Sequence, residues 1–79
     1  MKRYEANQNI RKLLGLSGRQ LAERVEVTKQ TISNYECGLN VIRPVERVIE
    51  IELDLAIERC TDAKIKEICE QLKLERLDA

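Results

Sequence analysis

The chain has 79 residues, a size typical of one domain, and a core this small leaves no room for an enclosed substrate cavity with a catalytic shell. It carries 14 Lys and Arg against 14 Asp and Glu, and it has no histidine and no run of about 18 apolar residues that would cross a membrane. These features disfavour an enzyme and a membrane protein. We therefore expect a cytoplasmic binding module.

The first helix is predicted over residues 6–14. Ile10 and Leu13 recur at helical spacing on one apolar face, and Gly15 is placed to end the helix. So short a helix is marginal in water, so we expect packing to stabilise it. Residues 1–5 precede the pattern, and we expect them to form a mobile basic end.

Two short helices joined by a tight turn are predicted within residues 16–38. Ser17 is placed to cap the first helix, and Gln20 three residues later completes a capping box. Thr28 is placed to cap the second helix, and Gly38 supplies the stop after it. Two capped helices within about 20 residues form a helix-turn-helix.

The two helices of this motif, predicted over residues 18–25 and 29–37, each have an apolar inward face. That face holds Leu21, Ala22, Val25, Ile32 and Tyr35. The outward face of the second helix is polar and carries four side chains at positions i, i+1, i+4 and i+5, namely Lys29, Gln30, Ser33 and Asn34. These four are the candidate recognition residues.

A fourth helix is predicted from Pro44, which suits the first turn of a helix, to about residue 60. Its apolar stripe is wider than one core contact requires. Its acidic side chains form an i, i+4 row made of Glu46, Glu50, Asp54 and Glu58. Like charges at this spacing repel by roughly 0.2–0.5 kcal/mol per pair, so we expect the row to be at best tolerated.

A fifth amphipathic helix is predicted to begin after Thr61 and Asp62, which have the character of an N-cap, and to end near residue 77. We expect its apolar face to form a dimer contact, and the alternative is a single core within one chain. This face consists of Ile65, Ile68, Cys69 and Leu72.

The three cysteines argue against a metal or redox site. Cys37, Cys60 and Cys69 are odd in number and lack the C-x-x-C spacing, and no histidine is available to complete a metal shell. We expect reduced, partly buried thiols, and the alternative is an intermolecular disulfide formed on air oxidation. No cofactor, metal or small-molecule ligand is expected.

The zero net charge hides an asymmetry between the two halves of the chain. Residues 1–43 hold eight Lys and Arg against four Glu, whereas residues 44–79 hold six against ten acidic residues. A basic half that contains the helix-turn-helix is the electrostatic pattern expected for contact with phosphate. The alternative is an ordinary solvated surface with a chance asymmetry.

The pattern L-S-x-x-Q-L-A-E-x-V-x-V-T-x-x-T-I-S-x-Y-E-x-G over residues 16–38 resembles the phage repressor and Cro-like helix-turn-helix family, often called the XRE family. With Ile10, Arg11 and Pro44 added, the resemblance covers roughly half of the chain. It implies an all-α, compact five-helix domain of lambda-repressor-like type over residues 1–79, with a DNA-binding core over 6–60 and a C-terminal helix over 61–79. The third helix would lie in the major groove of double-stranded DNA.

The resemblance also assigns roles to individual residues. The recognition residues match base-reading positions: Lys29 would reach guanine, while Gln30 and Asn34 would pair with adenine and Ser33 is versatile. A second group matches positions that touch phosphate, namely Thr28, Asn40, Arg43 and Arg19. Arg11 and Glu36 match a structural ion pair between the first and third helices.

Two residues depart from the family pattern. Glu26 occupies the turn position usually held by glycine, where a left-handed conformation costs a non-glycine residue on the order of 1 kcal/mol. Gly18 replaces a residue that often contacts phosphate, so we expect that contact to be absent. The loop before Pro44 is also about two residues longer than usual.

The sequence therefore predicts a DNA-binding transcriptional regulator, most similar to a phage or bacterial repressor. We expect a homodimer on a pseudo-palindromic operator, because one recognition helix reads only a few base pairs. The alternative is an antitoxin-like or adaptor module whose acidic C-terminal half binds a protein partner. No residue pattern of a catalytic site is present, so an enzyme is not expected.

Overall fold

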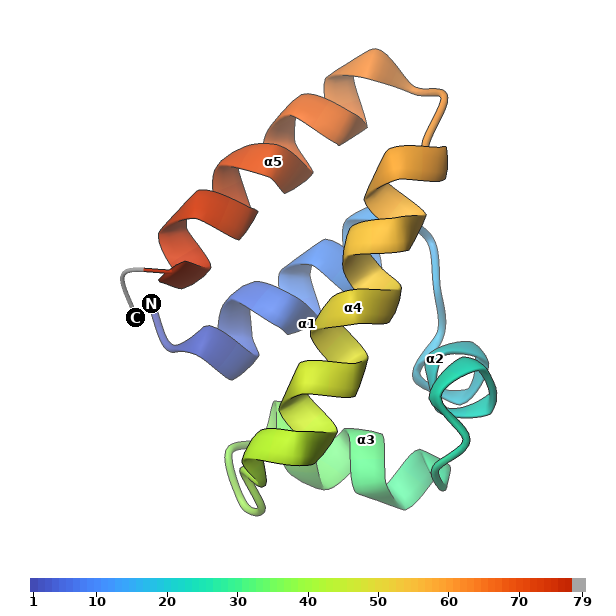
Figure 1. Ribbon diagram of the computed structural model, residues 1–79, viewed down its shortest axis with the longest axis vertical. Helices are drawn as coiled ribbons and strands as arrows, with labels where there is room; N and C mark the ends of the chain where they lie inside the picture. Colours follow the sequence, from blue (N-terminus) through green and yellow to red (C-terminus); the bar gives the residue numbers. More distant parts are fainter. Residues whose placement is uncertain (78–79) are drawn as a thin grey trace.

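The computed structural model describes residues 1–77, which form five α-helices and no strand (Figure 1). The all-α, five-helix class predicted from the sequence is confirmed. The helices follow one another in chain order as α1 Arg3–Leu13, α2 Gly18–Val25, α3 Lys29–Glu36, α4 Arg43–Arg59 and α5 Ala63–Leu77. None of these helices is long and apolar enough to cross a membrane.

The two central helices begin where their capping residues predict. The Gln20 backbone N–H donates to Ser17 Oγ at 3.0 Å, and the Ser17 backbone N–H donates to Gln20 Oε1 at 2.8 Å, which completes the capping box of α2. At the start of α3, the Thr31 backbone N–H donates to Thr28 Oγ1 at 3.1 Å. These hydrogen bonds satisfy helix N–H groups that would otherwise lack a partner.

The turn between α2 and α3 holds a non-glycine residue in the left-handed region. Glu26 has φ 58° and ψ 43°, and its backbone N–H donates to Glu23 O at 3.4 Å. The Val27 N–H then donates to Ala22 O at 3.0 Å, which closes the end of α2. The sequence comparison with the family pattern pointed to strain at this position, and the backbone angles place Glu26 in the strained region.

The N-terminal end is helical from Arg3, so the expectation of a mobile segment over residues 1–5 is wrong. The Lys2 backbone N–H donates to Glu5 Oε1 at 2.8 Å at the start of α1. Tyr4 packs edge-on against Tyr35 of α3, with ring centroids 6.4 Å apart. Tyr4 also lies so close to Gly38 that a Cβ at that position would meet its ring at 2.6 Å. Side-chain packing on α3 therefore extends α1 beyond its predicted start.

The hydrophobic core lies where α1, α2, α3 and α4 meet, and it continues to α5. In Figure 1, α4 crosses in front of α1, and α5 lies along α1, so that the last turn of α5 lies near the start of α1. The buried core residues are Ile10, Leu21, Ala22, Ile32, Tyr35, Ile49, Leu53, Ile57 and Cys69. This packing leaves α3 at one end of the molecule, beside the first turn of α4.

Glu26→Gly is expected to raise the free energy of unfolding by about 1 kcal/mol, because glycine adopts the left-handed conformation without a steric cost from Cβ. Urea denaturation followed by circular dichroism measures the change. Glu23→Gly, inside α2, is the matched control and is expected to lower the stability by about 1 kcal/mol. Equal destabilisation by both substitutions would contradict strain at Glu26.

Candidate nucleic-acid interface

The four candidate recognition residues lie on the outward face of α3. Lys29, Gln30 and Ser33 are exposed, and Asn34 is partly exposed, whereas Ile32 and Tyr35 on the opposite face are each 1% exposed. The helical period separates the two faces, because buried residues at 32 and 35 turn positions 29, 30, 33 and 34 away from the core. The structure thus brings all four polar side chains to one surface.

Two of these side chains are hydrogen-bonded to each other. Gln30 Nε2 donates to Asn34 Oδ1 at 2.8 Å, one helical turn apart. The bond leaves Gln30 Oε1 free to accept and Asn34 Nδ2 free to donate, and Gln30 Nε2 keeps one further proton. An amide with both a free acceptor and a free donor matches the N6 and N7 pattern of adenine in the major groove.

The candidate phosphate-contacting residues are exposed on α2, on the loop before α4 and at the helix starts. Arg19 and Asn40 are exposed, and Arg43 at the start of α4 has a side chain that is 73% exposed. Figure 1 shows the loop that leads to α4 beside the end of α3. Thr28 is exposed as well, but its hydroxyl already accepts the Thr31 N–H and lies 2.9 Å from Thr31 Oγ1. The Thr28 hydroxyl therefore already has a structural role as the N-cap of α3.

An ion pair fastens α3 to α1. Arg11 Nε donates to Glu36 Oε2 at 2.6 Å, and Arg11 Nη2 donates to Glu36 Oε1 at 3.0 Å, in a bidentate arrangement. Arg11 Nη1 also donates to Leu16 O at 2.7 Å, just before α2. The two side chains are 11% and 9% exposed, so water screens the pair only weakly. One arginine therefore holds three segments of the motif in place.

A second connection joins α3 to the first turns of α4. Tyr35 OH donates to Glu46 Oε2 at 2.6 Å, and Arg43 Nη1 donates to Glu46 Oε1 at 2.7 Å. Burial, together with the hydrogen bond to Glu46, raises the pKa of the Tyr35 phenol, which stays protonated and acts as the donor. The same carboxylate thus contacts the inward face of α3 and a candidate phosphate-binding arginine.

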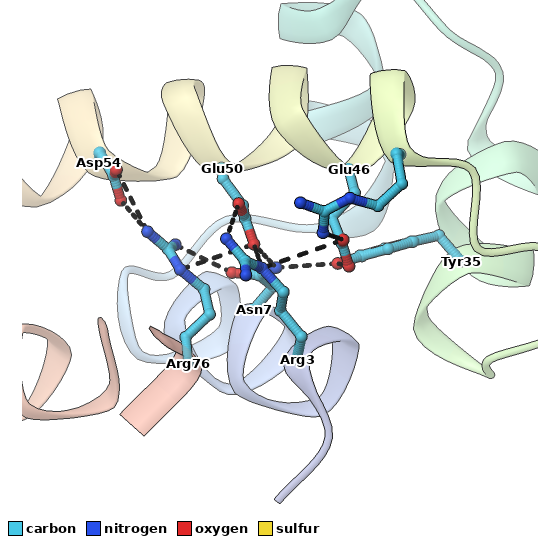
Figure 2. A network of polar contacts seen from close by, with 8 residues as sticks. Arg3, Asn7, Tyr35, Glu46, Glu50, Asp54 and Arg76 are labelled. Carbon is cyan, nitrogen blue, oxygen red and sulfur yellow. Dashed lines mark hydrogen bonds and ion pairs between the residues drawn. The ribbon is translucent and has the colours of Figure 1, made fainter. Parts of the chain in front are cut away.

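Glu50 lies at the centre of a larger buried network (Figure 2). Arg3 binds it bidentately, through Nε to Oε2 at 2.6 Å and Nη2 to Oε1 at 2.9 Å, and Asn7 Nδ2 donates to Oε2 at 2.9 Å. Burial by itself raises the pKa of the Glu50 carboxyl, but the hydrogen bonds from Arg3 and Asn7 and the charge of Arg76 outweigh it. The pKa is therefore lowered.

Arg76 connects α5 to this network. Its Nη1 donates to Asn7 Oδ1 at 3.1 Å, its Nη2 lies 3.1 Å from Asp54 Oδ1, and its Nε lies 3.6 Å from Glu50 Oε2. Within residues 1–77, Nε is the one buried side-chain polar atom without a hydrogen bond, and the nearby Glu50 carboxylate compensates its charge. Arg76, which is 4% exposed and lies in the last turn of α5, therefore anchors α5 to the rest of the fold.

Two of the four side chains in the acidic row of α4 are buried within the chain. Glu46 and Glu50 are 2% and 3% exposed, and Arg3, Arg43 and Arg76 neutralise them together with Asp54. Glu58 is the member of the row that is exposed. A signal for this was available, because Glu46 and Glu50 fall within the same helical arc as the apolar residues Ile49, Leu53 and Ile57. No sequence pattern indicated which arginine and asparagine residues would pair with Glu46 and Glu50.

Most of the α5 residues that were expected to form a dimer contact pack in or against the core of their own chain. Cys69 is 0% exposed, so its assignment to a dimer surface is corrected to a core position. Ile65 and Leu72 are partly buried and pack against the same core, while Ile68 is 45% exposed. Burial also raises the pKa of the Cys69 thiol. Cys37 is exposed rather than partly buried, and all three cysteines are free thiols.

Comparison with protein families finds that a family model described as helix-turn-helix matches residues 8–52, more than half of the chain. The matched segment begins within α1 and ends within α4, and it includes α2, α3 and the turn between them. Comparisons with curated proteins and with solved structures find no match.

Glu50→Gln is expected to reduce the amount of folding stability that the protein loses as the pH falls into the acid range. Because the pKa of Glu50 is lowered in the folded chain, the unfolded chain binds the proton more readily, so the stability contributed by this carboxylate is lost as the pH falls below about 4.5. Urea denaturation at a series of pH values measures the slope. Glu58→Gln, the exposed member of the same row, is expected to keep the slope of the wild type. An unchanged slope for Glu50→Gln would contradict its ionised state in the network.

Proposed function

Because this chain belongs to the helix-turn-helix family of XRE type, whose members are DNA-binding transcription regulators, we propose that it acts as a sequence-specific repressor. It binds a pseudo-palindromic operator as a homodimer in the cytoplasm of a bacterial or phage-infected cell, and it represses by occluding polymerase. The observation that carries this proposal is the polar outward face of α3, whose inward face is held by buried contacts to α1 and α4.

The proposed reading mode follows from the side chains on that face. Lys29 donates to guanine O6 and N7, and Gln30 pairs with adenine N6 and N7. The hydrogen bond from Gln30 to Asn34 supports this role, because it holds the Gln30 amide in one orientation before DNA arrives. A side chain ordered in advance loses less entropy on binding.

The phosphate contacts are proposed for Arg19, Asn40 and Arg43. Arg43 is the strongest of these, because its guanidinium is 73% exposed while one nitrogen is bound to Glu46. A guanidinium has five N–H donors, so Arg43 keeps donors for a phosphate while Glu46 orients it. Because the Thr28 hydroxyl accepts the Thr31 N–H, Thr28 would contact phosphate only through the hydrogen-bonding capacity that this capping bond leaves.

Two physical arguments support a homodimer. A single recognition helix reads only a few base pairs, and a chain with zero net charge gains little affinity from counterion release. Two copies related by a two-fold axis would place their recognition helices about 34 Å apart, in successive major grooves on one face of the duplex. The adaptor alternative is weakened, because three of the four acidic side chains in the α4 row, Glu46, Glu50 and Asp54, pair with arginines within the chain.

Selection of bound duplexes from a random DNA pool, with the mass of the protein measured in solution, tests the proposal. A palindromic consensus and a dimer mass are the expected results. Failure to enrich any sequence, with the protein shown to be folded by circular dichroism, would refute sequence-specific binding.

Gln30→Ala is expected to lose about 1–3 kcal/mol of binding free energy on the selected operator and to relax the preference at one or two base pairs. Arg43→Ala provides the contrast, because loss of a phosphate contact weakens binding to all sequences alike and lowers the salt dependence by about one ion. Fluorescence anisotropy with operator and scrambled duplexes at several salt concentrations separates the two effects. Unchanged base preference in Gln30→Ala would remove Gln30 from the reading residues.

A further inference from the structure

The solvent-facing side of α4 carries apolar residues along its whole length. Val48, Ile51 and Leu55 are 46%, 48% and 38% exposed, and Pro44 precedes them on the same side. Steps of four, three and four residues separate these positions, which is the a/d spacing of a helix that pairs with another helix. The core-facing residues of α4 lie on the opposite side. A solvated helix face normally carries polar residues at its centre, so we expect a partner to cover this apolar stripe.

An apolar hollow widens the stripe near the start of α4. It has a volume of about 210 Å³ and is lined by Val25, Val27, Pro44, Val45 and Val48. Val48 belongs to both the hollow and the stripe, so the apolar surface is continuous from the helix-turn-helix to Leu55. Two exposed residues just before α4, Val41 and Ile42, add further apolar area at the same end of the helix.

We propose that a second copy of this chain covers this face, with its α4 packed parallel to and in register with the first. This inference rests on the proposed function, since it assigns the homodimer surface of the DNA-binding protein. In this dimer Val48 contacts Val48, Ile51 contacts Ile51 and Leu55 contacts Leu55 of the second copy. The two-fold axis then runs along the seam between the two α4 helices.

The charges beside the stripe favour a second copy in this orientation. In a parallel pair, a residue on one flank faces the residue five positions later on the other helix. The exposed Arg47 then faces Glu52 of the second copy, and the exposed Arg59 faces Asp54 of the second copy, so both pairs are attractive. Within its own chain Glu52 already lies 3.4 Å from Arg24 and Asp54 lies 3.1 Å from Arg76, so each carboxylate would be shared between two arginines. An antiparallel pair centred on Ile51 would bring two Glu52 side chains together, which is unfavourable, and would place Arg47 near Asp54 of the second copy, which is attractive. The flanking charges therefore match α4 to itself, and the parallel arrangement avoids the contact between two Glu52 side chains.

The parallel arrangement also suits a shared DNA duplex. Figure 1 shows α3 beside the first turn of α4, while the last turn of α4 points toward the other end of the molecule. Because parallel helices begin at the same end, both copies of α3 lie at one end of the dimer. An antiparallel pair would place them at opposite ends, where one duplex would not reach both.

The apolar surface of α5 is more interrupted by polar residues. Ile68 and the partly buried Leu72 line a hollow of about 370 Å³, together with Glu67, Gln71 and Glu75. Ile68, Leu74 and Leu77 are exposed, but Leu74 and Leu77 lie at least about a third of a turn around the helix from Ile68. The remaining apolar residues of α5 that were expected to form a dimer contact pack against the core of their own chain. The dimer surface therefore belongs to α4.

A matched pair of substitutions tests this surface. Ile51 and Ile68 are the same residue type with nearly equal exposure, 48% and 45%, so Ile51→Asp and Ile68→Asp disturb the folded monomer to a similar extent. Ile51→Asp is expected to raise the dimer dissociation constant by roughly 100-fold, because an ionised carboxylate is buried without a partner. Ile68→Asp is expected to leave it unchanged. Analytical ultracentrifugation without DNA, with circular dichroism as a check on folding, measures both.

A disulfide variant tests the orientation independently. Val48→Cys, in a chain that also carries Cys37→Ser and Cys60→Ser, is expected to form a covalent dimer on oxidation, because parallel pairing brings the two copies of position 48 to disulfide distance. Leu55→Cys in the same background is expected to do the same. Crosslinking only between a Val48→Cys chain and a Leu55→Cys chain would show antiparallel pairing and overturn the proposal.

Three further outcomes would also overturn the proposal: a wild type that is monomeric throughout the concentration range, an Ile51→Asp variant that remains dimeric, or dissociation by Ile68→Asp alone. Operator binding by the same variants distinguishes a failure of this dimer surface from a failure of the proposed function. A wild-type dimer that Ile51→Asp dissociates but that selects no DNA would refute the proposed function and leave this surface standing. Selective DNA binding by a dimer that Ile51→Asp does not dissociate would refute this surface and leave the proposed function standing.

Discussion

Two buried carboxylates on the core side of α4 constrain how the helices of this protein fit together. Glu46 and Glu50 are 2% and 3% exposed, so each needs charged or polar partners inside the protein. Removing one partner of such a buried pair costs about 3–5 kcal/mol, because the remaining charge is cut off from water. The partners come from three other helices: Arg3 and Asn7 of α1, Tyr35 of α3 and Arg76 of α5. Charge pairing thus fixes the relative placement of four helices, together with apolar packing.

This arrangement positions α3, the proposed recognition helix, without using its outer face. Tyr35 connects the inward side of α3 to Glu46, and the ion pair between Arg11 and Glu36 connects its end to α1. Both contacts leave the side chains at 29, 30, 33 and 34 turned toward solvent. Stability and the proposed DNA recognition therefore depend on different residues of one short helix, so the outer face can change while the fold is kept.

Helix α4 reverses the usual distribution of polar and apolar residues. Carboxylates lie among its core residues, where arginines of α1 and α5 neutralise them, while Val48, Ile51 and Leu55 face solvent. The apolar outer stripe is not needed for the fold of one chain, because the inner side already carries the core. This division leaves the outer side of α4 available for a second copy, which is the dimer surface that we propose.

The sequence by itself determined the two central helices, their caps and the polar face of α3, because these depend on hydrogen bonds and periodicity within a few residues. The helical arc of α4 also held a signal that Glu46 and Glu50 are buried. Only the tertiary structure decided which partners they have, because Arg3 and Glu50 lie 47 residues apart and Asn7 and Arg76 lie 69 apart. It likewise decided that α1 begins at Arg3 and that Cys69 lies in the core. No local pattern encodes such contacts, because they depend on where distant helices meet.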